Sequence, residues 1–406
     1  MKLKSFFQNP AIIAPLAGLL AASPVTQASE LTDAISNGTV KVQLRYRFEG
    51  VDQDNALENA KASTLKSRIS FQTQEYRNFT GFVEVDDISN IGDDNHDTTR
   101  NGMGDHSVVA DPEGTEINQA WIQYTGIPDT KAKYGRQRIN LDNQRFIGGV
   151  GWRQNEQTYD GLTLVNNSIP DTRVTYAFID NINRIFGPDS GTPDEDLDAS
   201  INAININYSG LSAGKISAYA YLFDIDDALA LSTKTYGVRF SGKQKTDNLT
   251  FLYTAEYATQ EDYGDNPNSY DVDYWLLEAG VVVSGVTLKL GQETLEGDMR
   301  KGVAFTTPLA TLHKFQGWAD QFLGTPAGGV EDKQFTLKTK AFGATWTAVY
   351  HDFEAEDGSS DYGEEVDLAV AKKFGKVKAL LKYANYNADE FKVDTEKLWL
   401  QLQVNF

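Results

Sequence analysis

The sequence ends Thr395-Glu-Lys-Leu-Trp-Leu-Gln-Leu-Gln-Val-Asn-Phe406, where apolar and polar residues alternate. Leu398 and Leu400 fall on one parity, whereas Lys397 and Gln401 fall on the other. This period of two predicts a β-strand with one apolar and one polar face. A last strand that stops on an aromatic residue is typical of outer-membrane β-barrels, in which the apolar face meets lipid and the polar face meets a wet lumen. The last strand of a soluble sandwich is also amphipathic, so this segment alone leaves both folds open.

The N-terminal segment favours the membrane fold. Lys2 and Lys4 precede an apolar run at 11–22, and small residues follow up to Ala28. This order is typical of a secretory signal peptide, so we expect cleavage after Ala28 and removal of residues 1–28. The alternative is a membrane anchor, but the run at 11–22 is shorter than the roughly 20 residues that a spanning helix needs.

The composition agrees with a barrel and excludes other classes. The chain is polar on average, with a mean hydropathy of -0.42, yet it contains 19 Tyr, 21 Phe and 6 Trp. Barrel strands are only half apolar and carry aromatic girdles at the membrane interfaces. The chain has no Cys, which excludes disulfides and thiolate metal sites. A formal net charge of -20 argues against nucleic-acid binding, which needs a concentrated basic surface.

Alternating segments recur from Thr39 to Phe406, and we identify eighteen of them. Short and long connections alternate between them, and the turn string Ile-Pro-Asp-Thr occurs in equivalent hairpins at 127–130 and 169–172. Outer-membrane barrels sort their connections in this way, with short periplasmic turns and long outer loops. We therefore predict one all-β domain over residues 29–406, a transmembrane antiparallel β-barrel of about 18 strands with both termini periplasmic. The expected long loops are 50–62, 87–114, 139–156, 182–199, 224–233, 259–272, 295–331, 352–363 and 386–395.

Acidic residues gather in the long loops, notably at 93–113, 189–198 and 354–361. Solvated loop tips explain this pattern. The alternative is divalent-cation bridging to anionic lipid headgroups, because Ca²⁺ and Mg²⁺ prefer carboxylate oxygens as ligands. No spacing matches a dedicated Ca²⁺ loop, so the sequence assigns no metal ligand.

Strand parity places fourteen basic side chains on the lumen face against seven acidic ones. Rings of Arg or Lys in a pore select for anions, and guanidinium groups hold carboxylates bidentately. The predicted substrate pathway consists of Arg45, Arg47, Arg68, Arg136, Arg138, Arg145, Arg153 and Arg239, of which Arg145 and Arg153 lie in a loop. The remaining predicted lumen bases are Lys41, Lys66, Arg173, Lys289, Lys338, Lys340, Lys378 and Lys382. Several of these bases are alternatively partners of lumen acids in the wall, but their excess is expected to remain for a ligand.

Three blocks carry a family resemblance. Gly135-Arg-Gln-Arg-Ile-Asn-Leu-Asp-Asn-Gln-Arg-Phe-Ile-Gly-Gly-Val-Gly-Trp-Arg-Gln154, followed by Tyr159-Asp-Gly-Leu162, resembles the Gly-Arg-Gln…Arg-Phe-x-Gly…Trp-Arg-Gln…aromatic-Asp pattern of the bacterial alginate export porin family. The segments 307–332 and 382–399 are similar to a long loop and to the C-terminal region of family members. The resemblance implies an eighteen-stranded outer-membrane barrel with an arginine-lined passage for an anionic polysaccharide. The chain is shorter and more acidic than a dedicated alginate exporter and has many Lys in place of a dense Arg track, which leaves the substrate open.

The loop 295–331 is the longest connection and contains His313, Phe315, Trp318 and Phe322. Long loops with apolar side chains pack against another surface. We expect this loop to fold over or into the barrel mouth as a lid or constriction. The alternative is a contact with lipid or with a neighbouring barrel.

Enzymatic function is not expected, because the only four His show no spacing with a nucleophile or an acid pair that suits catalysis. No cofactor is expected. The function predicted from the sequence is an outer-membrane channel with a basic lumen that exports an acidic polysaccharide such as alginate. A general or small-anion porin, or one selective for oligosaccharides, is the alternative, and a plugged structural barrel or adhesin is a further one. The expected partners are outer-membrane lipid and lipopolysaccharide, the barrel assembly machinery through Phe406, the anionic cargo and a periplasmic export scaffold.

Overall fold

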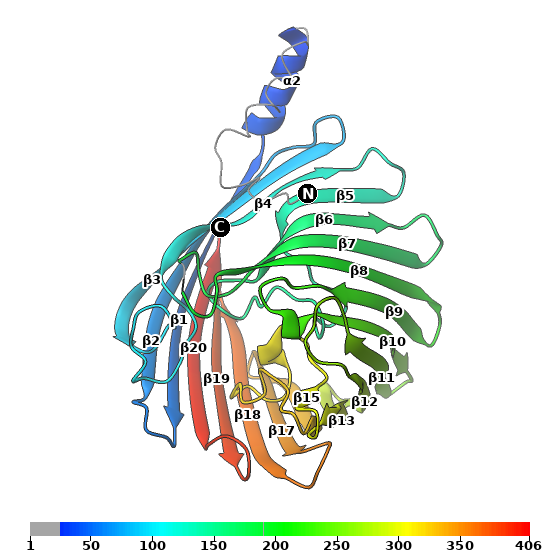
Figure 1. Cartoon of the computed structure of the whole chain (residues 1–406). Helices are drawn as coiled ribbons and strands as arrows, with labels where there is room; N and C mark the ends of the chain where they lie inside the picture. Colours follow the sequence, from blue (N-terminus) through cyan, green and yellow to red (C-terminus); the bar gives the residue numbers. More distant parts are fainter. Residues whose placement is uncertain (1–24, 190) are drawn as a thin grey trace.

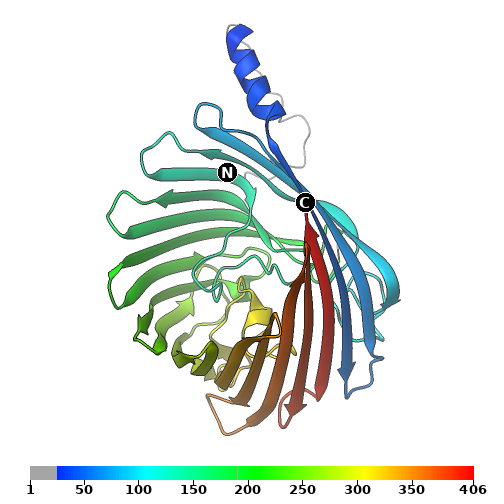
Figure 2. The same ribbon diagram turned by 180° about the vertical axis from the view of Figure 1, so that it is seen from behind.

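Eighteen strands form one closed antiparallel sheet in a computed structural model of the chain (Figures 1 and 2). The structure describes residues 25–189 and 191–406, with side chains from residue 29. Each strand pairs with the next along the chain, and β20 pairs with β1, which closes the barrel. The barrel strands are β1 (Thr39–Gln53), β2 (Ala60–Gln72), β3 (Phe79–Asn95), β4 (Gly114–Tyr124), β5 (Thr130–Gln137), β6 (Thr158–Asn166), β7 (Thr172–Asn183), β8 (Asp196–Leu211), β9 (Gly214–Phe223), β10 (Thr233–Lys245), β11 (Leu249–Asp262), β12 (Asp271–Val283), β13 (Val286–Leu295), β16 (Val330–Ala341), β17 (Ala344–Glu354), β18 (Asp361–Phe374), β19 (Val377–Ala388) and β20 (Thr395–Asn405). The strands β14 (Gly297–Asp298) and β15 (Val303–Ala304) and the 3-10 helices η2 (Leu229–Leu231) and η3 (Leu312–Lys314) lie in connections.

The alternation of the last strand is confirmed. Leu398, Leu400 and Leu402 are exposed on the outer wall, whereas Lys397 and Trp399 are buried on the inner side of β20. The outer side is the one that lipid covers in a transmembrane barrel, so exposed leucines are expected there.

The sorting of short turns and long loops is also confirmed. Thr130 donates its backbone N–H to the Ile127 carbonyl at 3.1 Å, and Thr172 donates to Ile169 at the same distance, so the two repeated strings form the same turn. The two-residue turn at Ser284-Gly285 has φ angles of 49° and 81°, which suits the right-handed twist of a hairpin.

Both ends of the barrel chain lie at the end with the short turns. The Phe406 backbone N–H donates to the Val42 carbonyl at 2.8 Å, which places the end of β20 beside the start of β1. A helix, α2 (Val25–Ser36), projects from this end in both views (Figures 1 and 2), and its Ala34 carbonyl accepts a hydrogen bond from the Gln74 N–H at 2.9 Å. The predicted cleavage after Ala28 falls within α2, and most of the predicted signal segment lies outside the described residues. No helix among the described residues is long and apolar enough to cross a membrane.

The seams of the barrel differ in length. The β1–β20 ladder runs from Gln43↔Asn405 to Gln53↔Thr395. The β4–β5 ladder runs only from Ala120↔Arg136 to Tyr124↔Ala132, because β5 ends at Gln137 and the chain then turns into the lumen.

Candidate functional site

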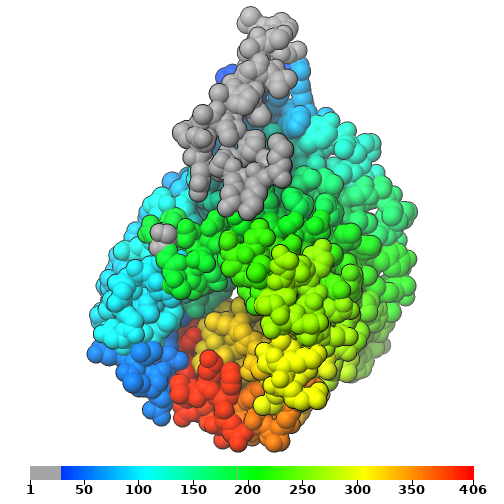
Figure 3. Space-filling model, viewed as in Figure 1, coloured from blue at the N-terminus to red at the C-terminus, as the bar shows by residue number. Residues whose placement is uncertain are grey.

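Two long connections fold into the barrel and meet there. We call residues 138–157, between β5 and β6, the first inner loop, and residues 296–329, between β13 and β16, the second inner loop. In both views the second loop, in yellow, lies inside the ring of strands (Figures 1 and 2). The surface is hollowed between the green and the gold-to-red segments (Figure 3).

The two inner loops are hydrogen-bonded to each other. Ile147 and Leu309 form a parallel β-bridge, and the Gly148 N–H donates to the Leu309 carbonyl at 2.8 Å. Thr311 donates its N–H to the Gln144 carbonyl at 3.0 Å and its hydroxyl to Gln144 Oε1 at 2.8 Å. The loops therefore form one unit inside the barrel.

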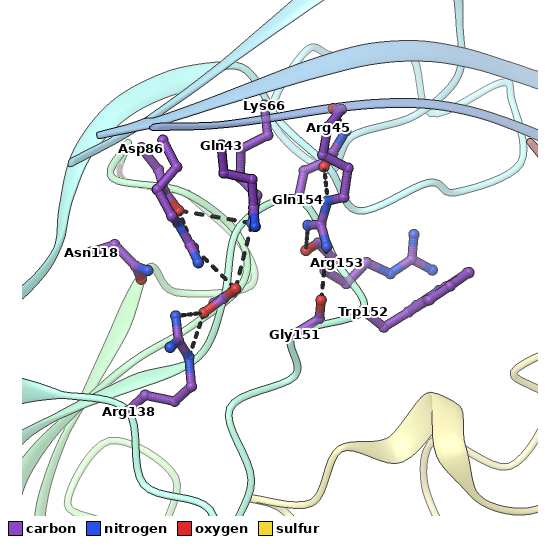
Figure 4. Close-up of polar contacts among 12 residues, drawn as sticks. Gln43, Arg45, Lys66, Asp86, Asn118, Arg138, Gly151, Trp152, Arg153 and Gln154 are labelled. Atoms are coloured by element: carbon purple, nitrogen blue, oxygen red, sulfur yellow. Dashed lines mark hydrogen bonds and ion pairs between the residues drawn. The ribbon is translucent and has the colours of Figure 1, made fainter. Parts of the chain in front are cut away.

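The first inner loop is fixed to β1 by arginines from the wall. Arg45 donates from Nε to Gln154 Oε1 at 2.8 Å and from its two terminal nitrogens to the Gly151 and Arg153 carbonyls (Figure 4). Arg47 donates to the Trp152 carbonyl, and its guanidinium lies 4.1 Å from the centre of the Trp152 ring. These two arginines bind backbone carbonyl groups of the first inner loop, and both are buried beneath it.

The same loop is fixed on the opposite side by Asp142. Its carboxylate accepts hydrogen bonds from Asn205 Nδ2 at 2.6 Å and from Ser217 Oγ at 2.9 Å. It also pairs with Lys215 Nζ at 3.1 Å. Since these partners belong to β8 and β9, the first inner loop crosses the lumen from one wall to another.

A buried ion-pair network surrounds the β1 attachment. Arg68 forms a bidentate pair with Asp86 and contacts Glu156 at 3.0 Å, and Arg138 donates to the same Glu156 (Figure 4 labels Lys66, Asp86 and Arg138). Its cations are Arg45, Arg47, Lys66, Arg68, Arg138 and Arg153. Its carboxylates are Glu49, Glu84, Asp86, Asp111, Glu156 and Asp320, and Asp320 also pairs with Lys397. Seven cations, with Lys397 included, against six carboxylates leave little net charge in this part of the lumen. Removing one partner from such a network leaves an uncompensated buried charge, which costs about 3–5 kcal/mol.

The second inner loop is fixed to β18, β19 and β20. His313 shares a hydrogen bond of 2.7 Å between Nδ1 and Asp320, and its Nε2 faces Lys382 Nζ at 2.6 Å. Burial is the main reason that the pKa of His313 is lowered to about 3, so Nε2 accepts the lysine proton and Nδ1 carries the imidazole hydrogen. The Trp318 and Ala319 N–H groups donate to one carboxylate oxygen of Glu365.

The predicted aromatic residues of this loop pack in three places. Phe315 lies 4.7 Å from the Arg145 guanidinium, and Arg145 is itself buried against Glu293 at 3.0 Å. Trp318 lies 3.7 Å from Lys382 Nζ. Phe322 is buried against Phe353 of β17, with ring centres 4.6 Å apart. The loop therefore packs against the inner wall.

One predicted pathway residue lies on the other side of the wall. Along β5, Gln137 is 1% exposed on the inner face, whereas Arg136 shares the outer face with Tyr134, which is 47% exposed. Arg136 forms a bidentate pair with Asp160 of β6. The prediction that Arg136 and Arg138 share a lumen face is therefore wrong, because β5 ends at Gln137 and the alternation does not continue to Arg138.

The other predicted arginines occupy the lumen but have partners. Arg153 pairs with Glu49 at 3.0 Å, and Arg239 with Glu256. Sequence reasoning missed Asp86 and Glu156, and Glu156 lies in a loop whose path the sequence does not give. The available signal was the parity of Asp86, which equals that of Glu84 on β3.

Comparison with known proteins gives the family. A family model described as alginate export matches residues 37–291. This chain belongs to the alginate export family. None of the curated proteins matches the chain.

Solved outer-membrane porins share the fold of this alginate export family member. OccAB4 of Acinetobacter baumannii superposes with a TM-score of 0.71 at 14% identity, over 91% of this chain and 98% of that one. OpdK of Pseudomonas aeruginosa, in a structure with vanillate, has a TM-score of 0.71 at 12% identity, over 92% of this chain and 99% of that one. OccD3 (OpdP) of the same organism has a TM-score of 0.71 at 13% identity, over 92% of each chain. The protein is an outer-membrane β-barrel porin of the alginate export family.

No group of three or more His, Asp or Glu in the described residues is arranged to hold a metal ion. The acidic loops thus remain without an assigned cation.

Proposed function

We propose that this outer-membrane channel passes anionic substrates, and that its cargo is an acidic polysaccharide such as alginate. The observation that carries the proposal is the family match over residues 37–291, joined to a closed barrel of eighteen strands. An eighteen-stranded barrel leaves an aqueous channel, and the two inner loops narrow it and determine what passes.

The proposal of an anionic cargo is supported by guanidinium groups that remain partly exposed to the lumen beside the inner loops. The Arg138 side chain is 28% exposed, although it pairs with Glu84 and Glu156. Guanidinium groups stay charged and match carboxylate geometry, which suits the repeated carboxylates of a uronate polymer.

The first experiment compares Arg138→Gln with Arg136→Gln in planar bilayers. Both residues lie at the same end of β5, but Arg136 is on the outer wall, so the second variant is a matched control. Removing one partly exposed charge is worth roughly 1 kcal/mol, so Arg138→Gln should weaken current block by oligouronates about fivefold. Block by neutral oligosaccharides should not change. Equal losses for charged and neutral saccharides would assign Arg138 to the wall alone, and a cation-selective reversal potential of the parent channel would refute anion passage.

A second candidate function is a selective porin for small anions or oligosaccharides without an export role. The observation that favours it is the first inner loop, which is fixed to β1 and to β8–β9 and so divides the lumen. The two functions differ in their dependence on cargo length. Polymer passage predicts dwell times that grow with the number of uronate residues, whereas a small-substrate porin predicts that permeation stops beyond a few residues.

A further inference from the structure

Four lysines on β16, β18 and β19 face the lumen at the end of the barrel that carries the short turns. Lys338 and Lys340 belong to β16, Lys373 to β18 and Lys378 to β19. The lumen-facing side of each strand is identified by its buried polar residues, which share the parity of the lysine on the same strand. These buried residues are Asp332 on β16, Glu365 and Asp367 on β18, and Lys382 on β19. Phe335, Leu337, Leu368 and Leu381 have the opposite parity and are exposed outside. All four lysines are exposed, so the lumen is open at this level.

The strand register brings these lysines together. Lys373 lies directly opposite Lys378, and Lys378 lies opposite Gln403 of β20. Like charges in directly opposed positions destabilise a sheet. The fold therefore bears an electrostatic cost at this site that a bound anion would remove.

Among the described residues, no Asp or Glu side chain pairs with these lysines. The segments 333–351, 368–388 and 397–406 contain no Asp or Glu. In the residues that the structure describes, none of the four lysines forms an ion pair or a hydrogen bond to a carboxylate. The deeper lumen differs, because Lys66, Arg68 and Arg153 there are paired with acids.

Uncharged hydrogen-bonding groups surround the lysines. Thr347 and Thr345 lie opposite Lys338 and Lys340, and Thr287 flanks Lys338 on the other side. Ammonium groups for carboxylates and hydroxyls for sugar oxygens together suit a charged saccharide.

We propose that Lys338, Lys340, Lys373 and Lys378 form a capture site for carboxylate-bearing saccharides at the short-turn mouth, and that it makes anion uptake by the channel depend on the side of approach. The inference rests on the proposed function and adds a direction to it. Acids occupy the loops at the opposite end, for example Asp105, Asp227 and Glu390. Other short turns of the same mouth contain Glu75, Asp129, Asp171 and Asp247, so the positive charge is a local patch on β16, β18 and β19. A patch lined by one sign of charge focuses oppositely charged ligands and raises their association rate by about 10- to 1,000-fold. If the short turns face the periplasm, as the sequence predicts, this capture site favours outward loading.

The test uses the full-length channel, inserted in one orientation in a planar bilayer, with a hexauronate added to one side at a time. The parent should be blocked at lower concentration from the short-turn side. Lys373→Gln with Lys378→Gln should lower the association rate from that side about tenfold and leave the rate from the other side unchanged. The control, Lys372→Gln with Lys376→Gln, removes two charges at the same hairpin, where Lys372 is on the outer face and Lys376 in the turn. Correct folding of each variant is verified by heat-dependent migration in gels.

The outcomes separate this site from the proposed function. Equal block from both sides, or equal effects of the two double variants, overturns the capture site and leaves uronate passage intact. Absence of block from either side overturns both. A neutral maltohexaose should show no side dependence, and equal asymmetry with that probe would assign the effect to shape and would overturn capture by charge. Inorganic phosphate should compete with hexauronate from the short-turn side only, and competition from both sides would contradict the site.

Discussion

The contact between the two inner loops leads to a prediction about Gly148. A Cβ at this position would lie 2.3 Å from Thr311 Oγ1 and 3.1 Å from Thr311 N. Gly148→Ala therefore pushes the loops apart at the position where the Gly148 N–H donates to the Leu309 carbonyl. The φ angle of Gly148 does not lie in the left-handed region that favours glycine. A side chain at this position is therefore opposed by the lack of space alone.

The expected magnitude follows from the contacts that compete. Forcing a methyl group into a packed site costs about 1–3 kcal/mol. The hydrogen bonds that join the loops at Gln144, Gly148, Val150 and Thr311 contribute about 0.5–1.5 kcal/mol each. The clash is thus comparable with the loss of two of these bonds, and it lowers the ratio of joined to separated loops by about five- to 150-fold.

Single-channel recording measures this change. Gly148→Ala should increase the conductance and the noise of the open channel, while the barrel stays folded in gels. Gly324→Ala is the control, because it lies in the second inner loop and its Cβ would meet nothing within 4 Å. A Gly148→Ala channel with the conductance and noise of the parent would refute the joining of the loops inside the barrel.

Three further outcomes are expected. Deletion of Phe406 should lower the amount of inserted barrel, because the Phe406 N–H and carbonyl both hydrogen-bond to Val42. Pulse-chase assembly assays measure this amount, and an unchanged yield would contradict the prediction. Replacing residues 300–328 by a short Gly-Ser linker should raise conductance and reduce anion selectivity while leaving the ladder intact; identical values would show that the loop does not gate the pore. The pKa of His313 is lowered to about 3 from 6.5, so its stabilising contribution is complete above pH 6.5 and is lost as pH falls toward 3, by up to about 1.4 kcal/mol per pH unit. His313→Gln should flatten the fall in the melting midpoint between pH 6.5 and 5, where the Asp320 carboxylate, with its pKa far below the ordinary value, does not titrate.

The sequence was sufficient for the wall of the barrel and insufficient for its interior. Alternation at Leu398 and Lys397 predicts their faces because the side-chain period of a strand is two. The equal turns ending at Thr130 and Thr172 were predicted because turn chemistry is local.

The partners of the lumen arginines could not be predicted in the same way. Parity gives the face of Arg45 but not the carbonyl groups it holds, because these arrive on a loop whose path depends on tertiary contacts. The same limit hid Glu156, which neutralises Arg68 and Arg138. The predicted substrate pathway was therefore assigned to the arginines, which have partners. Lys338, Lys340 and Lys378 were also predicted for the lumen and have no ion pair in the described structure, and Lys373 beside them was not predicted for the lumen.

The unequal seams of the barrel have a consequence for circular permutation. The native ends meet at a seam of eleven residue pairs between β1 and β20, where Arg47 also donates to Gln401 across the join. The seam between β4 and β5 has five pairs. A permuted chain that joins the native termini and opens at 125–129 would have to complete its cylinder at this short seam. Its last strand would be recognised by fewer than half as many backbone contacts, so insertion of the permuted chain should be slower although every native residue is still present.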